Sequence, residues 1–211
     1  MNYSEESLHA RTDSFVHVLI SDATISLREL GDNDTPFRRR SAIRTVFSSI
    51  EGLMYVTRDL IKVFPLSHAE ATVISEVSFE VTERGTISER KKFIPFDRVL
   101  KVIAKIIRKH RPEYKLDFNH PGWASLLRLL DVRHRLTHPK EIGDLSVSDQ
   151  EIEDANRGFY WFLAFALEVG RETVESVKVQ YANSPYRNEG LEQYLQELDE
   201  LMYGKKKPNS N

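Results

Sequence analysis

The sequence is organised around the segment Leu129–Lys140, which reads LLDVRHRLTHPK. Its apolar residues are spaced as on the buried face of a helix, and Pro139 disfavours the helical conformation in the residue before it, so the helix should end at His138. On an unbroken helix His138 would point away from Arg133. A break at His138 lets its imidazole turn back toward the guanidinium. We therefore expect Arg133 and His138 to converge beside a helix C-terminus, with His134 adjacent, as a candidate anion or phosphate site.

Apolar residues repeat at intervals of three and four along most of the chain, as on the buried faces of helices. The strongest run follows Thr35, the expected N-cap, and Pro36 at the first helical position. Capping boxes, Ser67–Glu70 and Ser148–Glu151, start two further helices. The helices expected from these signals cover residues 13–30, 36–64, 67–79, 96–111, 121–138 and 149–170.

These elements predict an all-α fold, an up-and-down bundle of about five main helices joined by short loops. Residues 80–94 carry many charges, β-branched residues and Gly85, which favour either a short hairpin or an irregular excursion. We expect a flexible N-terminus over residues 1–12, one helical domain over 13–180, a C-terminal helical extension over 181–203 and a disordered tail over 204–211.

Composition restricts the classes of function. The net charge of −2 gives no overall positive field toward nucleic acid, so nucleic-acid binding would need a local basic patch. The absence of cysteine excludes disulfides and thiol catalysis and is compatible with a reducing cytoplasm. No apolar run approaches the roughly 20 residues needed to cross a bilayer, and the first residues lack a secretion signal. We therefore expect a cytoplasmic protein without membrane association.

Metal and nucleophilic chemistry lack their usual sequence patterns. His134 and His138 are four residues apart, but Asp131 is the only carboxylate near them, and the chain contains no His-Glu-x-x-His motif. It also contains no Gly-x-Ser-x-Gly motif. The sequence therefore predicts no metal and no cofactor.

The segment from Arg133 to His138 remains as the candidate site. It follows a leucine-rich helix, has the polar His134 in second position, is closed by Thr-His-Pro-Lys, and precedes another long capped helix. In this context it resembles the R-x4-6-H motif of the HEPN domain family. The spacing alone also occurs from Arg11 to His17 and from Arg128 to His134, so the surrounding helices over residues 36–180 carry the resemblance.

The resemblance implies a small α-helical bundle, commonly a homodimer, and for many members a metal-independent endoribonuclease of toxin–antitoxin or antiviral defence systems. By carry-over, the motif arginine falls on Arg133, its polar neighbour on His134 and the histidine on His138. Some members have a tyrosine two residues after the histidine, which a partner nucleotidyltransferase modifies. Lys140 stands at that position here, so this pairing is not supported.

RNA cleavage without a metal requires deprotonation of the 2′-hydroxyl, protonation of the leaving 5′-oxygen and stabilisation of the phosphorane. Histidine performs such proton transfers, and a planar guanidinium suits two phosphoryl oxygens at once. On this hypothesis His138 is the general acid/base, Arg133 binds the scissile phosphate and His134 orients it, while a two-fold dimer brings two copies to one cleft. The supporting residues are Glu51, on one edge of the long helix with Arg44 and Arg58, and Thr137. Candidates for contacts to the RNA backbone are Arg135, Lys140 and Arg128.

Two other functions compete with the ribonuclease hypothesis. One is a non-catalytic HEPN-like module that dimerises and binds nucleotide, RNA or a partner protein. The other is a structural or adaptor bundle. An antitoxin or another defence-system protein is a candidate partner on the ribonuclease hypothesis. RNA is expected as the substrate of a ribonuclease or as the ligand of a binding module.

Overall fold

The computed structural model describes residues 5–183, 190 and 193. The expected all-α bundle is confirmed, and its helices account for most of these residues. The α-helices are α1 (Glu5–Asp32), α2 (Pro36–Leu60), α3 (His68–Ile74), α4 (Phe96–His110), α5 (Pro121–Thr137) and α6 (Asp149–Ala182). The short elements are the 3-10 turns η1 (Ile61–Val63) and η2 (Ile142–Leu145) and the strands β1 (Val77–Val81) and β2 (Ile87–Lys91).

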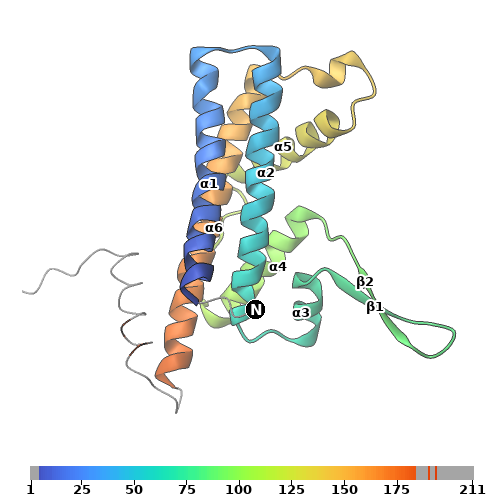
Figure 1. Cartoon of the computed structure of the whole chain (residues 1–211), viewed down its shortest axis with the longest axis vertical. Helices are drawn as coiled ribbons and strands as arrows, with labels where there is room; N and C mark the ends of the chain where they lie inside the picture. Colours follow the sequence, from blue (N-terminus) through green and yellow to red (C-terminus); the bar gives the residue numbers. More distant parts are fainter. Residues whose placement is uncertain (1–4, 184–189, 191–192, 194–211) are drawn as a thin grey trace, which may run out of the picture.

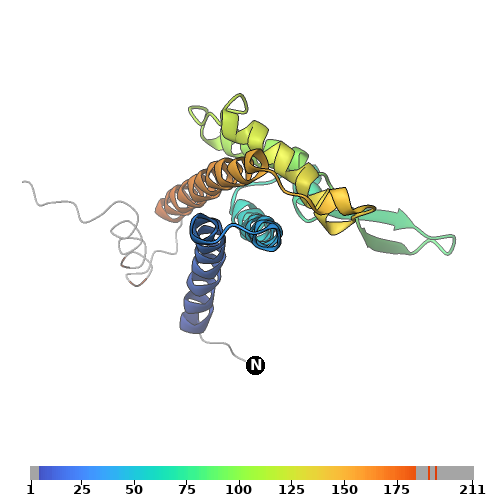
Figure 2. The ribbon, with the colours of Figure 1, turned by 90° about the horizontal axis from the view of Figure 1, so that it is seen from above.

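The bundle is built around α6. Seen from above, α6 runs between the pair α1–α2 and the pair α4–α5 (Figure 2), and along the bundle α1 and α2 lie side by side (Figure 1). Its middle carries Phe159, Phe162 and Phe165, all at most 1% exposed. This position explains why the sequence of α6 is apolar on nearly every side around these residues.

The helix starts follow from their capping residues. The Thr35 hydroxyl accepts a hydrogen bond from the backbone N–H of Arg38, and Ser67 and Ser148 form the expected capping boxes. The Glu70 carboxylate of the first box also accepts from Lys109 on α4, and this bond, with those from Ser67, lowers the pKa of Glu70 to about 2. Capping thus fixes where α3 begins and also ties α3 to the end of α4.

Residues 77–91 form a β-hairpin, which is one of the two structures expected for the segment around residues 80–94. Strands β1 and β2 pair antiparallel from Val77 opposite Lys91 to Val81 opposite Ile87, and Gly85 takes the positive φ that the turn requires. The preceding helix α3 ends at Ile74, earlier than the expected Phe79, because Glu76 adopts a positive φ and the extended chain of β1 follows. The hairpin extends away from the bundle (Figure 1).

Two helices are longer than the sequence predicts. α1 begins at Glu5, so the helix includes residues 5–12, which precede its expected start at residue 13. No proline or glycine interrupts residues 5–30, and polar residues alone do not end a helix. α6 continues through Gly170 to Ala182, because one glycine costs a helix only about 1 kcal/mol. The extension and tail expected over 181–203 and 204–211 lie almost wholly outside the described residues.

No helix in the described part of the chain combines the length and the apolar character needed to cross a membrane.

Candidate functional site

A groove of about 460 Å³ opens beside the C-terminal half of α5. Its walls come from α2, α5, the chain that returns from β2, and the first turn of α4. Arg133 and His134 of the candidate motif line it, with Glu51 opposite. The remaining lining residues are Phe47, Met54, Tyr55, Arg58, Glu76, Phe93, Ile94, Phe96 and Leu130. The groove therefore combines apolar side chains with charged groups from α2, from α5 and from Glu76, just before β1.

Arg133 is held at the wall of this groove by two contacts with α2. Its Nη2 donates to Oε1 of Glu51 at 2.9 Å, and its guanidinium carbon lies 5.2 Å from the centre of the Phe47 ring. The Arg133 side chain is 38% exposed and that of Glu51 52%, so this is a solvent-exposed ion pair. Such pairs contribute about 0–1 kcal/mol, and a competing anion can displace the carboxylate at small cost.

The edge of α2 that carries Glu51 positions the surroundings of the motif. Arg44 donates to the backbone carbonyl of Leu136 at 3.2 Å and so satisfies a carbonyl in the last turn of α5. Arg58 forms an ion pair with Glu76, whose carboxylate also accepts from the backbone N–H of Ile94. This edge is therefore more than a solvated helix flank, because its three charged residues fix α5 and the chain beside the hairpin.

The predicted helix break at His138 is confirmed. α5 ends at Thr137, and His138 leaves the helix with φ −127° and ψ 57° while its N–H still donates to the His134 carbonyl. The imidazole lies against His134, with ring centroids 5.3 Å apart. The described contacts join neither ring to the Arg133 guanidinium. The turn thus brings the two histidines together, both exposed, while Arg133 faces the groove.

Thr137 stabilises the backbone of this last turn. Its hydroxyl donates to the carbonyl of Arg133 at 2.7 Å, four residues earlier. The side chain is therefore engaged within α5.

Arg128 belongs to a hydrogen-bond network between α5 and α6 that surrounds a buried carboxylate, although its own side chain is 53% exposed. Its guanidinium donates twice to the Asp154 carboxylate, at 2.7 and 2.6 Å, and Ser125 donates to the same carboxylate at 2.8 Å. Asp154 is 2% exposed, and the bonds from Arg128 hold its pKa below the usual range. Arg128, which the sequence offers as an RNA contact, joins two helices here.

Arg135 ties the loop after α5 to the bundle. It donates to the carbonyls of Asp144 and Ser146 and to the Glu151 carboxylate, each at 2.6 Å. In the same loop Asp144 accepts from the backbone N–H of Lys140, which lowers the pKa of that carboxyl. The Lys140 side chain itself is exposed. Of the three predicted backbone-contact residues, Lys140 is thus the one whose ammonium group forms no hydrogen bond or ion pair with the described residues.

Histidines and carboxylates do not gather into a metal centre. Among the described residues, no three His, Asp or Glu side chains have positions that would hold a metal ion.

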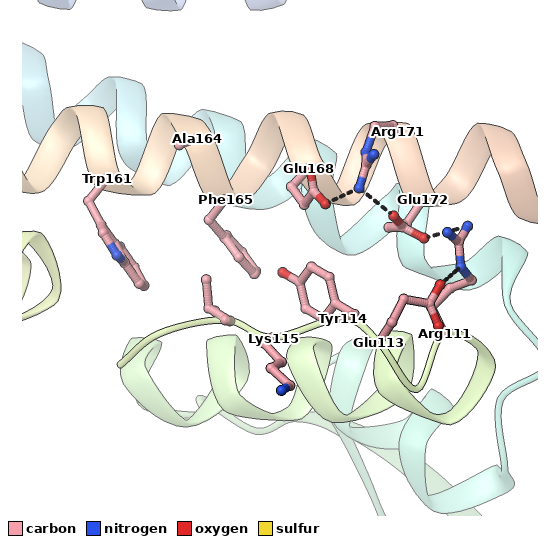
Figure 3. Close-up of a pocket in the computed structure, with 11 residues that line it drawn as sticks. Arg111, Glu113, Tyr114, Lys115, Trp161, Ala164, Phe165, Glu168, Arg171 and Glu172 are labelled. Atoms are coloured by element: carbon pink, nitrogen blue, oxygen red, sulfur yellow. Dashed lines mark hydrogen bonds and ion pairs between the residues drawn. The ribbon is translucent and has the colours of Figure 1, made fainter. Parts of the chain in front are cut away.

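A second cavity, of about 350 Å³, lies between α6 and the loop that follows α4 (Figure 3). Glu172, 2% exposed, lies between two arginines there: Arg171 donates to it at 2.9 Å, and Arg111 forms an ion pair with it at 3.0 Å. The buried Tyr114 hydroxyl points toward Phe165 and has no hydrogen-bond partner among the described residues (Figure 3). Burial raises the pKa of Tyr114.

We expect Tyr114→Phe to increase the free energy of unfolding by about 1 kcal/mol, because it removes a buried hydroxyl whose lost hydration no hydrogen bond repays. Denaturant unfolding measures this change. Tyr160→Phe, at a residue that is 47% exposed, is the matched control and should leave stability unchanged. A Tyr114→Phe protein less stable than the wild type would contradict the prediction.

Sequence reasoning did not single out the hairpin side of the groove. Phe93, Ile94 and Glu76 reach it only because the chain returns from the hairpin across the end of α2, a long-range arrangement without a local signal. The aromatic Phe93, directly after the charged run Glu89–Lys92, was the one available hint in the sequence.

Comparisons with known proteins add no family assignment. No protein-family model, no curated protein and no solved structure matches this chain. The groove, Arg133 and the histidine pair at the end of α5 are therefore the basis for any functional conclusion.

Proposed function

We propose that the protein is a metal-independent endoribonuclease that acts through Arg133, His134 and His138. The observation that supports this most directly is the exposed pair of imidazoles at the end of α5, with rings 5.3 Å apart and an arginine on the adjoining groove wall. Two histidines side by side supply a proton acceptor and a proton donor, as phosphodiester cleavage by an internal nucleophile requires.

In the proposed reaction the 2′-oxygen of the RNA attacks the neighbouring phosphorus while the bond from phosphorus to the 5′-oxygen breaks. One imidazole takes the proton of the 2′-hydroxyl, and another gives a proton to the departing 5′-oxygen. The products are a 2′,3′-cyclic phosphate and a 5′-hydroxyl, so neither water nor a metal enters this step. His138 is the acid/base and His134 its partner.

Arg133 stabilises the negative charge of the phosphorane in this proposal. Glu51 uses one of the five N–H donors of the guanidinium, and Phe47 covers one face, so donors remain for a phosphoryl oxygen. The contacts with α2 also limit the rotamers of Arg133, which reduces the entropy lost when RNA binds.

A homodimer completes the proposed site. One chain supplies one Arg133 and one pair of histidines on an exposed helix end, whereas a two-fold axis beside α5 would place two sets in one cleft. Such a cleft encloses the scissile phosphate better than a single exposed helix end does.

A non-catalytic RNA- or protein-binding module is the second candidate, and a specific observation favours it. Arg128 and Arg135 are both committed to contacts within the chain, and Arg133 faces the groove rather than His138. This arrangement leaves fewer positively charged side chains near the histidines to stabilise the transition state of RNA cleavage than the sequence motif alone suggests.

The experiment that separates the two candidates is incubation of the purified protein with single-stranded RNA in excess EDTA. We expect endonucleolytic products that end in 2′,3′-cyclic phosphate, identified by mass spectrometry, and no cleavage of the same RNA with 2′-O-methyl groups throughout. Light scattering on the same sample should give the mass of a dimer. Cleavage that EDTA abolishes would refute the metal-independent mechanism, and binding without cleavage of any RNA would favour the module.

A further inference from the structure

Every exposed side chain of α4 is Arg, Lys or His. These residues are Arg98, Lys101, Lys105, Arg108, Lys109 and His110. The opposite face of the helix is fully buried, with residues such as Val99, Leu100 and Ile103 at 0% exposure. A protein with a net charge of −2 thus concentrates positive charge on one helix surface.

Four of these residues form a straight row, called here the α4 basic stripe: Arg98, Lys101, Lys105 and Arg108. Their intervals of three, four and three residues place them on one face of the helix. At 1.5 Å per residue, the row is about 15 Å long. A row of this length can contact several consecutive phosphates of one strand.

Three of the four residues in the stripe form no ion pair with the described residues, so their charges are available to an external partner. Lys101 forms an ion pair with Asp97 at 3.2 Å. Arg98, Lys105 and Arg108 form none with the carboxylates of the described chain. This distinguishes the stripe from Arg128 and Arg135, which are held within the bundle.

The stripe begins at Arg98, two residues after a residue that lines the groove of the candidate site. Phe96, in the first turn of α4, lines the groove beside Arg133, and so does Phe93 just before the helix. Phe93 is 83% exposed and Tyr55, on the α2 side of the same groove, 73%. Exposed aromatic rings beside a row of cations are the two components of single-stranded nucleic-acid binding sites, in which bases stack and phosphates pair.

The same surface fits other anionic partners less well. Helices that bind membranes insert apolar side chains beside their cations, and α4 exposes no apolar side chain. Protein interfaces have a core depleted in charged residues, which the exposed face of α4 cannot provide.

We propose that the α4 basic stripe and Phe93 bind the backbone and a base of single-stranded RNA and lead the strand to the groove at Arg133. This inference rests on the proposed function for its substrate class and adds the path of that substrate. On this proposal, the affinity for RNA comes largely from residues of α4, which lie outside the motif at the end of α5.

The test uses the full chain and a fluorescent, 2′-O-methylated single-stranded RNA of mixed sequence, which binds without being cleaved. Fluorescence anisotropy gives the Kd over a series of salt concentrations. For Lys105→Gln/Arg108→Gln we expect a Kd about tenfold higher at low salt and a slope of log K against log salt that is smaller by about 1.4, since each phosphate contact contributes about 0.7 for single strands. Phe93→Ala should raise the Kd by about tenfold without changing the slope.

The control variant Lys62→Gln/Arg157→Gln removes two exposed cations elsewhere, on η1 and α6, and so makes the same change in net charge. It should bind RNA as the wild type does. An equal loss in both double variants, or no loss in the stripe variant, would overturn the inference. The inference would also be overturned if the wild type bound vesicles containing phosphatidylserine but not RNA, and the stripe variant lost the vesicle binding. Stripe-dependent RNA binding by a protein that cleaves no RNA would uphold the inference and refute the proposed nuclease.

Discussion

Replacing His138 with alanine is expected to lower the rate of RNA cleavage by about two to four orders of magnitude, the usual contribution of a general acid or base. His138 is exposed and follows the last residue of α5, and its side chain is not part of the buried core, so the variant should fold as the wild type does. Single-turnover rates with a defined RNA, alongside circular dichroism, measure both properties. His68→Ala, at an exposed histidine on α3, is the control and should retain full activity.

The companion variant Arg133→Ala distinguishes transition-state stabilisation from simple binding. If Arg133 contacts the phosphorane, kcat should fall much more than the affinity for the uncleavable RNA. Glu51→Gln removes the acceptor charge beside Arg133 while keeping its shape, and it should leave cleavage intact or increase it. Full activity of both the His138 and the Arg133 variants would exclude the proposed site.

The helical architecture was predictable because its signals are local. Thr35, Ser67 and Ser148 mark helix starts by hydrogen bonds to residues three positions away, and Pro139 ends α5 through its effect on the neighbouring residue. The errors are of the same kind. The start of α1 was missed because its first residues have no apolar stripe, and α6 passes Gly170 because packing outweighs the propensity of one residue.

The candidate site was less predictable because it depends on tertiary contacts. The sequence indicated that Arg133 and a histidine would lie at the end of α5, but the direction of the Arg133 side chain is set by Glu51 and Phe47 on α2. In the same way, only the fold shows that Arg128 forms its ion pair with Asp154 on α6. Residue type and spacing thus locate the motif, whereas the pairing of its charges requires knowledge of which helices are neighbours.

The position of the motif depends in turn on the close approach of α5 and α6, and Gly158 permits that approach. A Cβ atom on Gly158 would lie 2.9 Å from both the Cα and the backbone N of Leu126 and 3.3 Å from the carbonyl carbon of Ser125. These are backbone atoms of α5, which cannot rotate away as a side chain does. One methyl group at Gly158 therefore has to move the helix that carries Arg133 and His138.

Gly158→Ala is accordingly expected to lower the free energy of unfolding by about 2–3 kcal/mol, the upper part of the range for overpacking a core. For a chain of this size the melting temperature should fall by roughly 5–10 °C. The expected loss is net of the gain in helix propensity that alanine brings.

Gly170→Ala measures that gain by itself, because it lies on the same helix and its Cβ would meet no atom within 4 Å. It should raise the free energy of unfolding by up to about 1 kcal/mol. The two substitutions make the same chemical change in α6 with opposite expected signs, so helix propensity cannot account for both results. A Gly158→Ala protein as stable as the wild type would contradict the prediction. If α5 is instead displaced, RNA cleavage under folding conditions should fall with Gly158→Ala and remain unchanged with Gly170→Ala.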